Sequence, residues 1–149
     1  MSSGKHFHNV LCLSEAKGMD IIMKCFYHSD MDGKCAGSIV ARVTGNYNSK
    51  DYIMYNYDGE IPTELIEDGE TVYFVDLSFS VNTVDKLKEI VETKHCDLIW
   101  CDHHSSSMDI LAKYPEFSSI KGIRKEGISG AGLTWMYLMG CDFDDIPSS

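Results

Sequence analysis

Three short apolar segments, each with an aspartate at or just beyond its end, constrain the fold of this chain more than any other feature. The segments are "IIMKCFYH" (21–28), "TVYFVDLS" (71–78) and "CDLIWCD" (96–102), and each has the length and composition of a buried strand. A fourth segment, "DYIMYNY" (51–57), alternates like a strand and ends at an Asp-Gly turn signal. Continuous apolar strands are typical of parallel sheets that are covered on both faces.

Helical patterns lie between and after these strands. The expected helices span 33–45, 80–94, 105–114 and 129–140, and a further strand is expected at 117–123. The apolar face of the second helix consists of Val81, Val84, Leu87, Ile90 and Val91. Gly45 and Gly140 provide helix stop signals, and Ser129 provides an N-cap. Because strands and helices alternate, we predict an α/β fold with a mostly parallel sheet flanked by helices, similar to a Rossmann fold.

The composition is that of one globular domain. The chain has 149 residues, of which 44% are hydrophobic and 24% are charged. Residues 1–20 fit poorly with the remainder of the chain and are interpreted as an N-terminal extension, in which His6 and His8 are solvated; residues 21–149 form the predicted domain. Six cysteines without a CxxC pair favour buried free thiols in a reducing compartment. With no signal-peptide pattern and no apolar run long enough to span a membrane, we predict a cytoplasmic protein.

The net charge excludes one class of partner. At -10 and a pI near 4.9, the chain has no general attraction for nucleic acids or anionic membranes. We therefore expect no stable binding to duplex nucleic acid and no membrane association. A phosphate-containing substrate would need local positive charge, which divalent cations held by clustered carboxylates would supply.

The strand ends carry residues that suit such a cation site. They are His28, Asp30 and Asp32 in "HSDMD", Asp76 in "FVDLS", and Asp102, His103 and His104 in "CDHHS". Each group alone is ordinary, since aspartates cap helices and histidine pairs occur on loops. Parallel strands, however, bring all three groups to one edge of the sheet, where α/β proteins bind ligands. A set of carboxylates and imidazoles without thiolate favours Mn²⁺, Mg²⁺ or Fe²⁺. The set is large enough for two ions about 3.5–4 Å apart, with Asp76 as the bridge.

The three motifs "HSDMDG", "VDLS" and "DHHS", in this order, resemble motifs I to III of the DHH phosphoesterase superfamily. The form His-x-Asp-x-Asp is most similar to the branch of RecJ-like, small-oligoribonucleotide and cyclic-nucleotide phosphodiesterases. The resemblance covers residues 22 to 140. It implies that His28, Asp30, Asp32, Asp76 and His103 ligate metal, that Asp102 orients the histidines, and that His104 contacts the scissile phosphate; Asp76, His103 and His104 are then the catalytic set.

A phosphate site is also predicted near "KGIRKEGISGAG". Arg124 lies in the densest basic cluster of the chain, and Ser129 and Gly130 begin a helix whose free N–H groups attract anions. A solvated basic loop and a plain helix cap are the alternative. Tyr55 and Tyr57, near a strand end, are candidates for stacking on a nucleobase.

The chain departs from the family pattern at its end. Relatives carry a second, smaller domain that closes over the metal site, and we expect this domain to be absent here. A further aspartate ligand often comes after the last helix; Asp142, Asp144 and Asp145 are interpreted as a solvated acidic tail instead.

The resemblance implies a phosphoesterase that depends on Mn²⁺, with Mg²⁺ as the alternative metal, and that hydrolyses phosphodiester bonds of short oligonucleotides or cyclic nucleotides. One alternative is a pyrophosphate or polyphosphate hydrolase. Another is a catalytically silent domain that binds metal and nucleotide. A regulatory domain phosphorylated on aspartate is a more distant alternative, which the paired histidines argue against. Self-association into a homo-oligomer is also considered.

Overall fold

A four-stranded, fully parallel sheet forms the centre of the computed structural model, which describes residues 22–141. Its strands are β1 (Met23–His28), β2 (Tyr52–Tyr55), β3 (Thr71–Val75) and β4 (Asp97–Cys101), in the order β2-β1-β3-β4. The predicted α/β fold with a parallel sheet is confirmed. The proposed extension, with His6 and His8, and the tail that contains Asp142, Asp144 and Asp145 lie outside the described residues.

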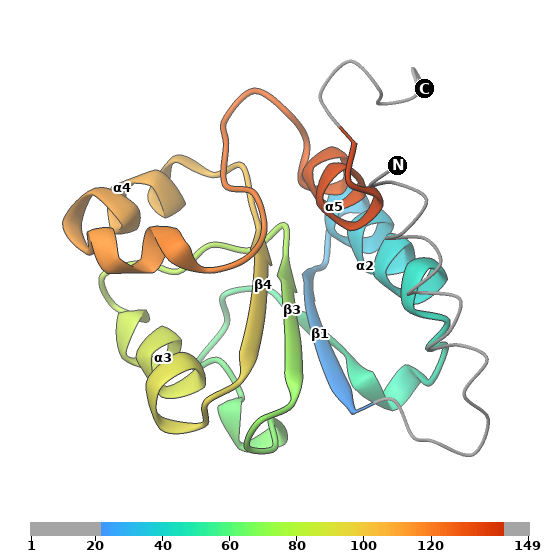
Figure 1. Ribbon diagram of the computed structural model, residues 1–149, viewed down its shortest axis with the longest axis horizontal. Coiled ribbons are helices and arrows are strands. Elements are labelled where there is room, and N and C mark those ends of the chain that lie inside the picture. Colours follow the sequence, from blue (N-terminus) through green and yellow to red (C-terminus); the bar gives the residue numbers. More distant parts are fainter. Residues whose placement is uncertain (1–21, 142–149) are drawn as a thin grey trace.

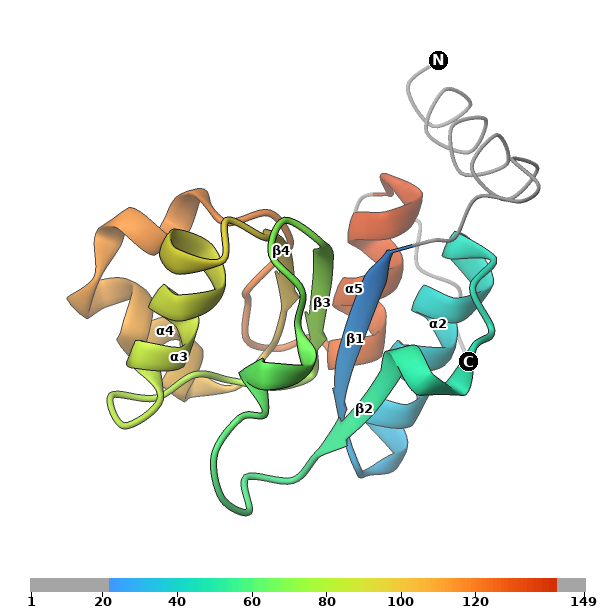
Figure 2. The ribbon, with the colours of Figure 1, turned by 90° about the horizontal axis from the view of Figure 1, so that it is seen from below.

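Helices cover both faces of the sheet (Figures 1 and 2). The α-helices are α2 (Met31–Thr44), α3 (Val84–Lys88), α4 (Ser105–Lys113) and α5 (Gly130–Met139), and α3 continues as a π-type turn at Glu89–Thr93. Helices α2 and α5 pack against each other on one face, over a core that includes Cys25, Val40 and Leu133. Helices α3 and α4 cover the other face, over a larger core that includes Phe26 and Trp100.

Helix α2 starts at the edge of the sheet where the strands end. Its N-cap is Asp30, whose side chain accepts a hydrogen bond from the N–H of Gly33 at 2.8 Å. Gly33 permits this arrangement, because a Cβ at that position would lie 2.1 Å from the carbonyl oxygen of His28. The helix ends at Gly45, with φ 74°, as predicted. The helix begins at Met31, two residues earlier than the pattern 33–45 indicated.

Two predicted elements are wrong in part. The helix expected at 80–94 begins at Val84, and Val81, assigned to its apolar face, is 57% exposed. The strand expected at 117–123 is replaced by a 3₁₀ helix at Pro115–Ser119 and by single bridges from Lys121 and Arg124 to the β4 edge. Gly122 interrupts the segment, because its φ is 110° and because a Cβ at this position would lie 2.1 Å from the carbonyl oxygen of Trp100.

None of the helices within residues 22–141 has the length and apolar character that a membrane-spanning helix requires.

Candidate metal centre

The three polar strand ends converge at one edge of the sheet. Nδ1 of His28, at the end of β1, lies 3.0 Å from Oδ2 of Asp30 and 4.0 Å from Oδ2 of Asp76, which follows β3. Nε2 of His103, beyond β4, lies 3.0 Å from Oδ1 of Asp76 and 3.4 Å from Oδ2 of Asp32. Residues from three strand ends therefore surround one carboxylate, as the parallel sheet predicts.

Asp76 is the centre of this cluster. Two groups of side chains have their candidate ligand atoms within 4.8 Å of one another, and Asp76 belongs to both. The groups are His28, Asp30 and Asp76, and Asp76, Asp102, His103 and His104. These Asp/His groups can bind a metal ion, since carboxylate and imidazole are common ligands of divalent cations.

The carboxylate of Asp76 is in an unfavourable environment without a cation. The side chain is fully buried, and neither of its oxygens makes a hydrogen bond within the described part of the chain. Burial, together with the charges of Asp32 and Asp30, raises the pKa of Asp76 to about 9. The backbone is also in the left-handed region, with φ 57°. A buried carboxylate that accepts no hydrogen bond is costly to ionise, and a bound cation would offset that cost.

Helix α5 approaches Asp76 closely because its first residue is glycine. A Cβ at Gly130 would lie 2.5 Å from Oδ1 of Asp76. The sequence pattern had pointed only to the N–H group of this glycine. The structure shows that the absence of a side chain lets the start of α5 form one wall of the cluster.

Asp30 and Asp32 both contribute to local structure as well as to the cluster. Burial acts to raise the pKa of Asp30, but the hydrogen bond from Gly33 and the contact with His28 outweigh it, so that the pKa lies below its usual value. The carboxylate of Asp32 accepts hydrogen bonds from the N–H groups of Gly130 at 2.9 Å and Ala131 at 2.8 Å. Asp32 thus ties the start of α5 to the start of α2.

Asp102 lies behind the paired histidines. One of its oxygens is 2.6 Å from Nδ1 of His104, and the other accepts hydrogen bonds from the backbone N–H of His104 and from the hydroxyl of Ser107. When Nδ1 of His104 donates to Asp102, its Nε2 remains available on the outer side. The rings of His103 and His104 lie 4.5 Å apart. Ser107 could not be identified from the sequence, because a serine in a run of three carries no distinguishing pattern.

The residues predicted to bind phosphate are engaged within the chain. Asp32 takes up the N–H groups at the start of α5, and Ser129 caps the helix by accepting from the N–H of Gly132. Arg124 donates to the carbonyl oxygens of Trp100 and Lys121 at 3.0 Å each and to that of Ser118. In this structure Asp32 occupies the position that we predicted for a substrate anion. The guanidinium of Arg124 holds the segment that follows α4.

The two tyrosines after β2 differ in exposure. Tyr55 is buried, and its hydroxyl donates to the carbonyl oxygen of Gly59, so its ring is not free to stack on a base. Tyr57 is 44% exposed and packs its ring against His28, with 5.4 Å between the ring centroids. Burial of its inner part raises the pKa of Tyr57. Of these two tyrosines, Tyr57 is therefore the one that lies beside the cluster in a position to contact a ligand.

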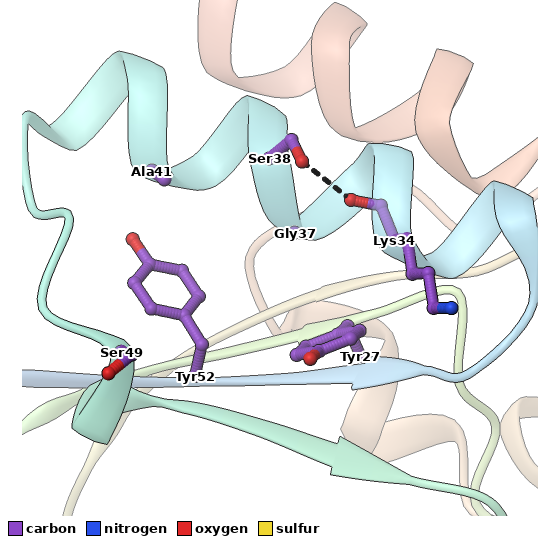
Figure 3. Close-up of a pocket in the computed structure, with 7 residues that line it drawn as sticks. All are labelled: Tyr27, Lys34, Gly37, Ser38, Ala41, Ser49 and Tyr52. Atoms are coloured by element: carbon purple, nitrogen blue, oxygen red, sulfur yellow. Dashed lines mark hydrogen bonds between the residues drawn. The ribbon is translucent and has the colours of Figure 1, made fainter.

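A separate pocket of about 330 Å³ lies between α2 and the edge of the sheet (Figure 3). Rings of Tyr27 and Tyr52 rise from β1 and β2 toward the helix, where Gly37 leaves room for the first of them. No residue of the strand-end cluster lines this pocket. Its helical lining residues share one face of α2, and Asp32 lies on the opposite face. The pocket is thus distinct from the candidate metal centre.

The fold and the cluster together define an α/β protein with an Asp/His site, capable of holding a metal ion, at the carboxyl edge of a parallel sheet. Comparisons with protein-family models, with curated proteins and with solved structures give no significant match to this chain. The resemblance to the DHH superfamily therefore rests on the motifs in the sequence and stays a prediction.

Proposed function

We propose that this chain is a phosphoesterase that depends on divalent metal ions and hydrolyses phosphodiester bonds in short oligonucleotides or cyclic nucleotides. The observation that carries the proposal is Asp76, a buried carboxylate that makes no hydrogen bond within residues 22–141 and belongs to two adjacent groups of ligand atoms. A shared carboxylate between two such groups is the arrangement expected for a pair of ions in hydrolytic sites. The DHH-like motifs supply the reaction class.

The donor atoms favour Mn²⁺, with Mg²⁺ as the alternative. The clustered side chains offer carboxylate oxygens and imidazole nitrogens, which suit these ions better than a structural zinc site. The thiol nearest in sequence, Cys101, is buried, and burial raises its pKa to about 11. A thiol with that pKa stays protonated near neutral pH and does not compete as a ligand.

The residues of the chain take distinct parts in the proposed reaction. Two divalent cations, when bound, activate a water molecule and neutralise charge on the phosphoryl group. Asp102 holds His104 through Nδ1, and Nε2 can donate a hydrogen bond to a phosphoryl oxygen when the ring carries a proton on both nitrogens. The side chain of His104 is 37% exposed, so a substrate can reach it. His28 and Asp30 would hold the ion nearer β1, and His103 the ion nearer β4.

One observation favours a second candidate, a pyrophosphate or polyphosphate hydrolase. Tyr55 is buried, which removes one of the two residues predicted to stack on a base. A compact anhydride substrate needs no stacking surface, so the burial of Tyr55 fits it better than a nucleotide substrate.

Hydrolysis assays test the proposal. Bis(p-nitrophenyl) phosphate, a short dinucleotide and pyrophosphate are each incubated with Mn²⁺, Mg²⁺ or chelator. We expect turnover of the diesters with Mn²⁺, none with chelator, and none in Asp76→Ala. Asp68→Ala is the matched control, because the side chain of Asp68 is 84% exposed and precedes β3 at the other end of that strand. Turnover of pyrophosphate alone would select the second candidate. Folded protein that binds Mn²⁺ without turnover of any substrate would refute both and indicate a binding domain.

A further inference from the structure

Tyr57 is fixed beside His28 by its backbone conformation, by a hydrogen bond and by a ring contact. Its backbone has φ 63°, a left-handed conformation that is rare for residues other than glycine. Its hydroxyl accepts a hydrogen bond from the N–H of Ser78 at 2.9 Å. Its ring meets Tyr55 edge-on, with 5.4 Å between centroids. A bulky side chain in a strained conformation near a functional site suggests that the side chain itself is required there.

The two histidines that flank the cluster are oriented by different means. Nδ1 of His104 is fixed by the carboxylate of Asp102 at 2.6 Å. Nδ1 of His28 is buried and makes no hydrogen bond within residues 22–141. It is also the atom that points into the cluster, toward Asp30 and Asp76. At this atom the carboxylate of Asp30 lies 3.0 Å away without hydrogen-bond geometry. The ring of Tyr57 packs against the imidazole and provides a second restraint.

We propose that Tyr57 is a positioning residue that holds the imidazole of His28 with Nδ1 turned toward the metal site. The ring of Tyr57 blocks rotation of the imidazole, which would carry Nδ1 away from Asp30 and Asp76. The bond to Ser78, two residues after Asp76, fixes the tyrosine to the segment that follows β3. Tyr57 thereby sets the distance between a ligand on β1 and the shared carboxylate. This inference rests on the proposed function in one respect, the binding of metal at this cluster, and not on the reaction.

Binding of Mn²⁺ alone, measured by calorimetry on the full chain, tests this role. Residues that orient metal ligands typically contribute 10–100-fold to affinity, so we expect Tyr57→Leu to weaken Mn²⁺ binding by about tenfold. Tyr57→Phe keeps the ring and loses only the bond to Ser78, and we expect a loss of about threefold. Tyr47→Leu is the matched control, because Tyr47 is 72% exposed and lies in the loop after α2. Thermal unfolding in chelator establishes that each variant is folded, and Tyr57→Phe carries the test if Tyr57→Leu does not fold.

Double variants separate positioning from a general structural effect. If Tyr57 acts through His28, Tyr57→Leu causes no further loss of affinity in a His28→Ala background and the full loss in a His103→Ala background. Equal losses in both backgrounds, or wild-type affinity in Tyr57→Leu, would overturn the positioning role while leaving the metal centre intact. Wild-type protein that binds no Mn²⁺ would overturn the metal centre, and with it both proposals.

Discussion

Replacing Asp76 by asparagine should remove a pH-dependent loss of stability from the metal-free protein. The ordinary pKa of the carboxyl, 3.8, applies in the unfolded chain, whereas burial and the charges of Asp32 and Asp30 raise it to about 9 in the folded protein. Between these values the folded protein keeps a proton that the unfolded chain has lost. The free energy of unfolding then falls by about 1.4 kcal/mol for each pH unit.

The sign of the effect is set by the raised pKa. The stability contributed by protonated Asp76 is fully present below pH 3.8 and is lost as the pH rises toward about 9. From about pH 5 to about pH 8 the loss is on the order of 4 kcal/mol. Asparagine has nearly the same shape and does not ionise. The variant should therefore be more stable than the wild type at the higher pH, although it lacks the proposed metal ligand.

Urea unfolding in chelator, followed by tryptophan fluorescence to which the fully buried Trp100 contributes, measures this difference. The decisive quantity is the change of unfolding free energy with pH in the wild type minus that in Asp76→Asn. With Mn²⁺ at about 100 times its dissociation constant, the wild type should gain about 2.7 kcal/mol and the variant almost nothing. If the two proteins show the same pH dependence in chelator, Asp76 is not a strained buried acid and the reasoning is refuted.

Three further substitutions test other parts of the site. Gly130→Ala places a Cβ 2.5 Å from Oδ1 of Asp76, so it should cost about 1–3 kcal/mol in urea unfolding and weaken Mn²⁺ binding in calorimetry; unchanged affinity would contradict the close approach. Asp30→Ser keeps an acceptor for the N–H of Gly33, so it should be about 1 kcal/mol more stable than Asp30→Ala, while both lose Mn²⁺ affinity equally. In urea unfolding, Tyr57→Gly should be more stable than Tyr57→Ala by about 1 kcal/mol, because φ at this position is 63°; the reverse order would show that this backbone is unstrained.

The sheet and the convergence of its strand ends could be predicted from the sequence because both depend on local patterns. Apolar runs of strand length and helix stop signals such as Gly45 are visible without a structure. Once the strands are parallel, topology alone brings Asp76 and His103 to one edge. The prediction of a site at this edge required no knowledge of side-chain positions.

The features that the sequence did not reveal depend on contacts between distant residues. No local pattern in the sequence reveals the hydrogen bond that Asp32 accepts from the start of α5. The same holds for the packing of Tyr57 on His28. The strand expected at 117–123 is absent because Phe117 enters the core from a 3₁₀ turn, and Gly122 then breaks the pairing with β4. Val81 is exposed because α3 begins only at Val84. Phe117 fitted the pattern of a strand and Val81 fitted the pattern of a helix, but tertiary packing did not support a regular element at either position.

The bond between Asp32 and Gly130 has a consequence for how the protein is made. The two residues are 98 positions apart, and the carboxylate emerges from the ribosome long before the start of α5 does. At a synthesis rate of about 5–20 residues per second, the interval is on the order of 5–20 s. During that time the acidic strand ends emerge one after another without the wall that α5 provides. The candidate metal centre is thus completed only after α5 has emerged, and a cation bound earlier would meet an open, solvated cluster.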